Sequence, residues 1–176
     1  MHIGFDLDGI FVATPPFIPK KVIEWLYRGH DQKFFYRFPT RAEQAVRVIT
    51  HMPILRPLMQ KNIDILKKKK KTGHAYYLIS SRFGFLRART HAIITTHKLS
   101  EVFDMMYFNF DNAQPHLFKD AVIKKLAISR YIDDDLPLLQ FLAKQNSRIL
   151  FYWLNSKEKK EIEKNLFAIT DLRDVF

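Results

Sequence analysis

Short runs of apolar residues recur along the chain, separated by stretches in which apolar and polar residues alternate with helical spacing. The runs are almost continuously apolar, which is typical of strands in a parallel sheet covered by helices on both faces. They predict five strands: Ile3 to Phe5, Ala75 to Ile79, Met105 to Phe108, Arg130 to Ile132 and Ile149 to Trp153. Strands that alternate with helices predict an α/β fold with a doubly wound, Rossmann-like parallel sheet.

The amphipathic stretches between these runs predict the helices. Apolar positions spaced three and four residues apart favour a helix over an additional strand. The predicted helices are Leu55 to Lys71, Arg87 to His97, Lys119 to Leu126, Pro137 to Lys144 and Ser156 to about Leu166. Gly73 follows the first of them as a C-terminal signal, and Ser156 is the expected N-cap of the last.

The segment from Thr14 to about Met52 contains no good strand pattern. It predicts one helix from about Lys20 to Arg28, and a second that begins at Thr40, where Glu43 completes a capping box. Between these helices stands an aromatic cluster of Phe34, Phe35, Tyr36 and Phe38. We interpret the cluster as the small core of an inserted subdomain, with stacking on a nucleobase as the alternative.

The chain length of 176 residues suits one domain with a small insert. We expect a core of residues 1–13 and 53–176, with residues 14–52 as a small helical cap. The absence of cysteine excludes disulfides, thiolate metal sites and thiol nucleophiles. The first residues lack a signal-peptide pattern and no apolar run is long enough to cross a membrane, so we expect a cytoplasmic protein without a membrane partner.

The net charge of +11 indicates an affinity for phosphates, nucleic acids or anionic lipid, without deciding among them. We interpret Lys67 to Lys71 as the solvated last turn of a helix, where cations suit the helix dipole. Basic residues expected nearer the carboxyl edge of the sheet are better candidates for contacts with a substrate. They are Arg82 and, from the predicted cap, Lys20, Lys21, Arg28, Lys33, Arg37 and Arg41.

Two carboxylates, Asp6 and Asp8, follow the first predicted strand. Residues two apart on an extended chain point the same way, so both should face the crevice in which such folds bind ligands. Adjacent carboxylates repel each other unless a cation lies between them, and a divalent metal held by oxygen atoms is the natural partner. Gly9 allows the chain to turn sharply after the pair.

Further polar residues fall at the same predicted edge of the sheet. Ser80, Ser81 and Arg82 end the second strand, Asp133, Asp134 and Asp135 end the fourth, and Lys119 opens the helix before the fourth. The carboxyl ends of parallel strands meet at one edge, so we expect these side chains to lie together. Chance explains each motif singly, but explains the ordered set poorly.

This ordered set resembles the four motifs of the haloacid dehalogenase superfamily of phosphohydrolases, and the resemblance covers nearly the whole chain. The motifs are Asp6-Leu7-Asp8-Gly9, Ser80, Lys119 and Asp133-Asp134. The resemblance implies motif-bearing strands that lie side by side, a helical cap after the first motif, and Mg²⁺ as the cofactor.

The resemblance also implies catalytic roles. Asp6 would attack phosphorus and form an aspartyl-phosphate, while Asp8 would protonate the leaving oxygen and then deprotonate the attacking water. Ser80 would hydrogen-bond a phosphoryl oxygen, with Ser81 as its alternative. Lys119 would neutralise the phosphate and orient Asp6.

The metal ligands implied by the resemblance are Asp134, Asp6 and the backbone carbonyl of Asp8. Asp133 would either contact these ligands without binding the metal or be a further ligand. Because the acidic run continues to Asp135, the identity of the metal ligand stays open by one position. Ser81 and Arg82 are the expected substrate-binding residues.

We therefore expect an Mg²⁺-dependent phosphatase that acts on a small phosphomonoester. The residues at the ends of the second and fourth predicted strands, Ser80-Ser81-Arg82 and Asp133-Asp134, look most like those of the superfamily's 5′-nucleotidase-like branch. This resemblance favours a nucleotide as the substrate. Two alternatives stay open: an enzyme that acts on phosphorylated nucleic-acid ends, motivated by the net charge of +11, and a binding domain of the same fold without turnover. The pattern does not predict the oligomeric state.

Overall fold

A seven-stranded sheet forms the centre of the structure, a computed structural model in which residues 1–15, 36–70, 73–154 and 158–176 are described. The strands are β1 (His2–Phe5), β2 (Ala75–Ser80), β3 (Met105–Phe108), β4 (Arg130–Asp133), β5 (Leu150–Leu154), β6 (Lys160–Glu163) and β7 (Leu166–Ile169). Their order is β3-β2-β1-β4-β5-β7-β6, and each neighbouring pair is parallel except β6 and β7. The predicted mostly parallel α/β sheet is confirmed, and β1 lies between β2 and β4.

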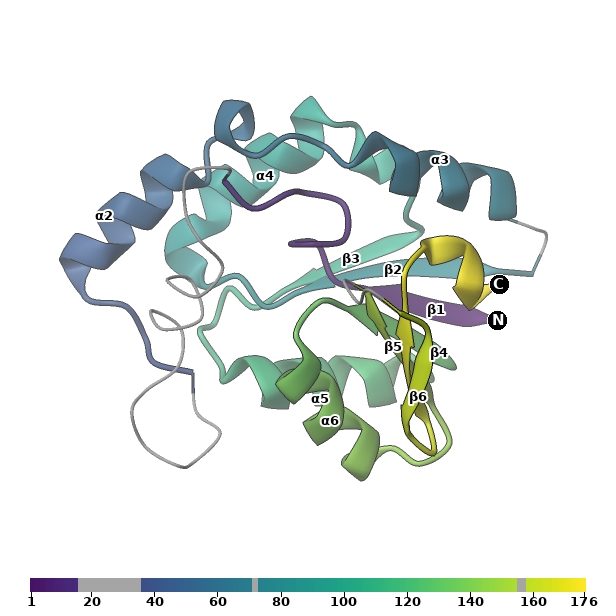
Figure 1. Ribbon diagram of the computed structural model, residues 1–176. Helices are drawn as coiled ribbons and strands as arrows, with labels where there is room; N and C mark the ends of the chain where they lie inside the picture. The colour runs from purple at the N-terminus through teal and green to yellow at the C-terminus, as the bar shows by residue number, and fades with distance from the viewer. Residues whose placement is uncertain (16–35, 71–72, 155–157) are drawn as a thin grey trace.

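Helices cover both faces of this sheet (Figure 1). The described helices are α2 (Arg41–Thr50), α3 (Gln60–Lys69), α4 (Arg87–Thr96), α5 (Pro115–Lys125) and α6 (Leu136–Gln145). Helices α3 and α4 lie on one side, and α5 and α6 lie on the other. This arrangement explains why the central strands are apolar on both faces.

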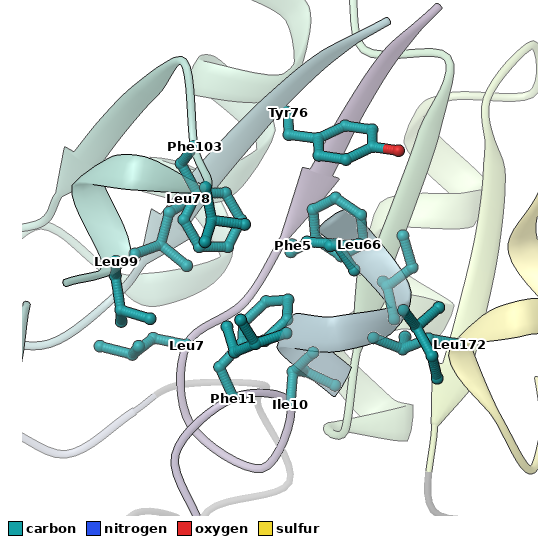
Figure 2. Packing of buried hydrophobic residues seen from close by; sticks show 14 of the residues in the cluster. Phe5, Leu7, Ile10, Phe11, Leu66, Tyr76, Leu78, Leu99, Phe103 and Leu172 are labelled. Carbon is teal, nitrogen blue, oxygen red and sulfur yellow. The ribbon is translucent and has the colours of Figure 1, made fainter. Parts of the chain in front are cut away.

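Two hydrophobic clusters fill the spaces between the sheet and its helices. The cluster on the α3 and α4 side contains Phe5, which makes edge-to-face contacts with Phe11 and Tyr76 at ring distances of 5.6 and 5.7 Å (Figure 2). The cluster on the α5 and α6 side contains Tyr131 and Phe151, whose ring centres are 6.3 Å apart. All five of these rings are almost completely buried, so the motif-bearing strand ends rest on a close-packed interior.

The C-terminal segment corrects the sequence prediction. Residues 160–166 belong to the hairpin of β6 and β7 rather than to a helix, and the expected N-cap Ser156 lies outside the described residues. The Lys- and Glu-rich composition favours a helix locally. Pairing of β7 with β5 overrides that preference and buries Leu166 completely. The sheet consequently has seven strands instead of about five.

Two helix starts also differ from the prediction. Residues Pro53–Leu55 form a short 3-10 turn and α3 begins only at Gln60, because Pro57 interrupts the helical hydrogen bonding. Helix α5 begins at Pro115, so Lys119 lies inside the helix instead of opening it. Proline at a first helical position costs no hydrogen bond.

The described part of the predicted cap contains its second helix. Thr40 is the N-cap of α2, and the capping box with Glu43 is present as expected: the Glu43 carboxylate accepts from the Thr40 backbone amide at 2.7 Å. The predicted helix from Lys20 to Arg28 lies outside the described residues, as do Phe34 and Phe35. The cap boundary at residues 14–52 stays a prediction. Among the helices of the described ranges, none has the length and apolar character needed to cross a membrane.

Candidate active site

The site is built at the carboxyl ends of three adjacent strands, β2, β1 and β4. β1 leads into Asp6 and Asp8, β2 ends at Ser80, and β4 ends at Asp133. The strand register places Phe5 opposite both Leu78 of β2 and Ile132 of β4, so the three strands end at nearly the same level of the sheet. The adjacency of these strands brings together motifs that are far apart in the sequence.

Lys119 joins Asp6, the predicted nucleophile, to Asp133, a predicted metal-binding residue. Its Nζ atom donates to Asp6 Oδ1 at 2.7 Å and to Asp133 Oδ2 at 2.6 Å, and its side chain is only 2% exposed. Burial lowers the pKa of Lys119, but Asp133 and Asp6 outweigh it and raise the pKa well above its usual range. The amine is therefore held as a cation directly beside the predicted nucleophile.

Asp6 is a buried carboxylate with Asp133 and Asp8 near it. Burial is the largest effect on its pKa, and together with the neighbouring Asp133 and Asp8 it raises the pKa to about 7 despite the opposing effect of Lys119. Within the described ranges, carboxylate oxygens of Asp6, Asp133 and Asp134 all lie within 4.8 Å of one another. These hard oxygen donors and their surplus charge fit Mg²⁺, which would stabilise the ionised form of Asp6.

The third member of the acidic run has other partners. Asp135 is the N-cap of α6, accepting from the Leu138 amide at 3.2 Å, and it also accepts from the Tyr36 hydroxyl at 2.6 Å. Asp134 instead lies against Gly9, where an added Cβ would collide with its carboxylate. This geometry favours Asp134 over Asp135 as a metal ligand.

Asp8 has different surroundings from Asp6. Arg82 donates to both of its oxygens, from Nε at 2.7 Å and from Nη2 at 2.7 Å, and Arg56 also pairs with Asp8 Oδ1. Burial raises the pKa of Asp8, but the two guanidinium groups outweigh burial and hold the pKa well below its usual range. The Asp8 carboxylate therefore contacts arginines and does not join the acidic cluster of Asp6, Asp133 and Asp134.

The two serines of the second motif have different positions. Ser81 lines the pocket described below, whereas Ser80 is 1% exposed and its Oγ atom has no hydrogen-bond partner among the described residues. A buried hydroxyl without a partner is costly, which leaves Ser80 suited to a group that is supplied by a ligand. Both serines stay candidates for the phosphoryl contact.

The site opens into a pocket of about 460 Å³, a size typical of small-molecule sites. All the predicted catalytic and metal-binding residues except Ser80 line it. Another part of the wall is apolar or aromatic and consists of Tyr36, Phe83, Leu86, Pro115, Leu136, Pro137, Leu138 and Trp153. Trp153 is fixed by an indole hydrogen bond to the Asp134 carbonyl at 3.0 Å. The pocket therefore combines one strongly charged end with a hydrophobic wall.

Sequence reasoning missed Arg47 and Arg56, which line the pocket and are each 5% exposed. Neither residue belongs to a motif, and Arg47 lies on a helix whose apolar residues Val46 and Ile49 are 58% exposed. The usual orientation of an amphipathic helix would place Arg47 in solvent, so only the tertiary structure identifies it.

Other basic residues expected near the chemistry lie elsewhere. Arg37 pairs with Glu43 and Arg41 is exposed at the start of α2, and neither lines the pocket. Lys20, Lys21, Arg28 and Lys33 lie outside the described residues. Of the basic residues named from the sequence as substrate contacts, Arg82 alone reaches the pocket within the described ranges.

No protein-family model matches the sequence, and no curated protein matches it. Solved structures do resemble it. A putative β-phosphoglucomutase from Thermotoga maritima has a TM-score of 0.62 at 12% identity, over 99% of both chains. The D,D-heptose 1,7-bisphosphate phosphatase of B. bronchiseptica, complexed with magnesium and phosphate, has a TM-score of 0.58 at 12% identity, over 99% of this chain and 94% of that one.

A second kind of neighbour is larger than this chain. A chain of the Pnkp1/Rnl/Hen1 complex has a TM-score of 0.53 at 14% identity; the match covers 86% of the present chain but only 44% of that one. The present chain therefore spans less than half the length of that neighbour. At such identities the likeness shows the fold, and the neighbours include haloacid dehalogenase-superfamily hydrolases.

Proposed function

We propose that this chain is an Mg²⁺-dependent phosphatase that hydrolyses a small phosphomonoester, with a nucleotide as the favoured class. The observation that carries the proposal is the placement of the Lys119 amine 2.7 Å from Asp6 and 2.6 Å from Asp133, beside the oxygens of Asp134. A carboxylate nucleophile, a fixed cation and a set of metal-binding oxygens are the parts that phosphoryl transfer requires. The phosphatase neighbours support the same reaction class.

The residues divide the reaction into two steps. A carboxylate oxygen of Asp6 attacks phosphorus, the bond from phosphorus to the leaving oxygen breaks, and protonated Asp8 gives its proton to that oxygen. Ionised Asp8 then takes a proton from water as the water oxygen attacks phosphorus, and the bond to Asp6 breaks to release inorganic phosphate. Lys119 balances charge on the phosphoryl oxygens throughout.

Asp6, Asp133 and Asp134 would hold Mg²⁺, which supplies neutralisation of phosphate charge when it is bound. Asp8 is held ionised by Arg56 and Arg82 in this structure. The ionised form suits the second step, in which the carboxylate accepts a proton from water. The first step requires the protonated form, so the proposed role of Asp8 as a general acid requires Arg56 and Arg82 to release its carboxylate when substrate binds.

A second candidate function is supported by the net charge of +11 and by the fold shared with a chain of an RNA repair complex. It is the removal of a phosphate from a nucleic-acid end. This function predicts binding that weakens steeply with salt, because phosphate contacts release counterions. A chain that binds phosphate and Mg²⁺ without turnover would instead be a binding domain of this fold.

The test is release of inorganic phosphate from nucleoside monophosphates, an aryl phosphate and a phosphorylated oligonucleotide, with Mg²⁺ or with chelator. We expect Mg²⁺-dependent turnover that Asp6→Asn lowers at least 10³-fold, since the nucleophile is lost. Asp111→Asn, at an exposed turn, is the matched control and should leave turnover unchanged. Turnover that persists in Asp6→Asn would reject Asp6 as the nucleophile.

A further inference from the structure

We propose that Tyr131 is a positioning residue of this site, which acts through Asp133 to fix the direction of the Lys119 ammonium. The inference rests on the proposed function, because Lys119 supplies the cation of that reaction. Tyr131 is completely buried on β4 and is not one of the residues that line the pocket. Its contribution is therefore transmitted through its neighbours and not by contact with the substrate.

Three hydrogen bonds fix the Asp133 carboxylate. Its Oδ2 atom accepts from Lys119 Nζ at 2.6 Å and from the Tyr131 hydroxyl at 3.1 Å, and its Oδ1 atom accepts from the Asp135 amide at 3.1 Å. Because Tyr131 and Lys119 donate to the same oxygen, the hydroxyl restricts the positions that this oxygen, and with it the ammonium, can take. The low dielectric of the interior strengthens such a network of buried polar groups.

The aromatic ring of Tyr131 lies beside the same ammonium. Lys119 Nζ is 5.7 Å from the ring centre, a distance at which an aromatic ring attracts a cation. A lysine ammonium has three donors, and Lys119 directs one to Asp6 and one to Asp133. With these two directions fixed, the third is fixed as well, and it can serve a phosphoryl oxygen in the pocket that Lys119 lines.

Gly4 on the neighbouring strand leaves the space that the ring occupies. The register of β1 and β4 places Gly4 opposite Tyr131. A Cβ atom added to Gly4 would lie 2.8 Å from Cδ2 of the Tyr131 ring and 3.1 Å from Cδ1 of Ile79. Because the interior is close-packed, the ring has no free volume into which it could move. The position of the Tyr131 hydroxyl is therefore set by the packing of β1 against β4.

Tyr76 on β2 provides a matched comparison, in the hydrophobic cluster on the other side of the sheet (Figure 2). Both tyrosines are completely buried, and Tyr76 also has a lysine near its ring, with Lys70 Nζ 5.5 Å from the ring centre. The two residues differ at the hydroxyl, because that of Tyr76 has no hydrogen-bond partner among the described residues. Replacing each by phenylalanine removes the same atom, but only at Tyr131 does the change remove a contact to Asp133.

The first test measures kcat and KM of Tyr131→Phe and Tyr76→Phe with Mg²⁺, on the phosphomonoester that wild-type protein hydrolyses fastest. We expect Tyr131→Phe to lower kcat about tenfold and to leave KM within about twofold, since Lys119 keeps its charge but loses its fixed direction toward the transition state. Tyr76→Phe should retain both wild-type values. A hydroxyl with a structural role alone would lower the free energy of unfolding without changing kcat of the folded enzyme.

The second test needs no turnover. Proton–nitrogen NMR of protein with isotope-labelled lysine detects ammonium groups that hydrogen bonds protect from exchange with water, and loss of a signal in Lys119→Arg identifies that of Lys119. We expect the same Lys119 signal in wild-type protein and in Tyr76→Phe, and a shifted or broadened signal in Tyr131→Phe. If Tyr131→Phe does not fold, Gly4→Ala, which displaces the ring and keeps the hydroxyl, replaces it in both tests.

The outcomes separate this inference from the proposed function. Equal kcat in Tyr131→Phe and Tyr76→Phe, or a Lys119 signal that is the same in both, overturns the role of Tyr131 even when wild-type protein is an active phosphatase. Absence of the Lys119 signal from wild-type protein overturns it as well. A signal that changes only in Tyr131→Phe, in a protein that hydrolyses no phosphomonoester, supports the positioning of Lys119 and rejects the phosphatase proposal.

Discussion

Gly9 shows how one residue shapes the site. Its φ of +74° lies in the left-handed region, and a Cβ atom at this position would collide with the Asp134 carboxylate. Both features follow from the sharp turn that brings the chain after Asp8 against the acidic run. Glycine is therefore required twice, for its backbone angle and for the space that it leaves.

A pair of alanine substitutions separates these two requirements. Gly73 also has a positive φ, of +83°, but among the described residues beyond its chain neighbours nothing lies within 4 Å of an added Cβ. Both Gly9→Ala and Gly73→Ala should lower the free energy of unfolding by about 1–2 kcal/mol from backbone strain. Gly9→Ala should in addition weaken Mg²⁺ binding at least tenfold, because Asp134 must move. Calorimetric Mg²⁺ titration and chemical unfolding measure the two effects, and equal Mg²⁺ affinity in both variants would contradict this account.

At the scale of the element, the C-terminal hairpin shows how pairing decides structure. β7 pairs with β5, and the Asn165 side chain between β6 and β7 donates to the carbonyls of Asn146 and Ile149, both at 3.1 Å. The helix or strand propensity of a segment carries no information about such long-range pairing. The final turn, Leu172–Val175, then returns the chain to α3 through Asp171.

Asp171 gives this contact a dependence on pH. Its carboxylate accepts from the Arg173 amide at 2.9 Å and pairs with Lys61 at 2.6 Å. Hydrogen bonds from Arg173 are the largest cause that holds the pKa of Asp171 below its usual range. A lowered folded-state pKa stabilises the protein above the unfolded-state pKa of about 3.9, and this contribution is lost as the pH falls below that value.

Asp171→Asn should therefore lower the free energy of unfolding at pH 7 by about 1–2 kcal/mol, and the difference from wild type should shrink as the pH falls from 4 toward 2. Urea unfolding at several pH values measures this difference. Asp64→Asn, at an exposed position on α3, is the control. A difference that stays constant with pH would mean that the ionised carboxylate is not the source of the stability.

At the scale of the whole molecule, the acidic cluster couples metal binding to folding. Asp6, Asp133 and Asp134 come from strand ends that meet only in the folded sheet. A cation bound to the folded state alone stabilises it through mass action. Burial, together with Asp133 and Asp8, raises the pKa of Asp6 to about 7, and a bound cation would favour the ionised form of this carboxyl.

Mg²⁺ at ten times its dissociation constant should raise the free energy of unfolding by about 1.4 kcal/mol. Thermal unfolding in Mg²⁺ and in NaCl of equal ionic strength isolates the specific effect. Asp134→Asn should abolish most of the difference, while Asp111→Asn should retain it. Equal stabilisation by the two salts would exclude a specific site at the cluster.

Much of the fold could be predicted because its evidence is local. Nearly continuous apolar runs locate β1 to β5 within one or two residues, and Thr40 with Glu43 correctly marks the start of α2. The carboxylates, Ser81, Arg82 and Lys119 could be named because parallel strands present their carboxyl ends at one edge. The sequence by itself thus determined the α/β class and the chemical groups that gather at that edge.

Only the tertiary structure decided which groups touch. Arg56 lies 48 residues from Asp8 and Arg82 lies 74 residues away, yet both pair with it. Asp135 accepts a hydrogen bond from Tyr36 and caps helix α6. β7 pairs with β5 in a segment whose local composition predicted a helix. These outcomes depend on contacts between distant segments and on burial, which periodicity and propensity along the chain do not contain.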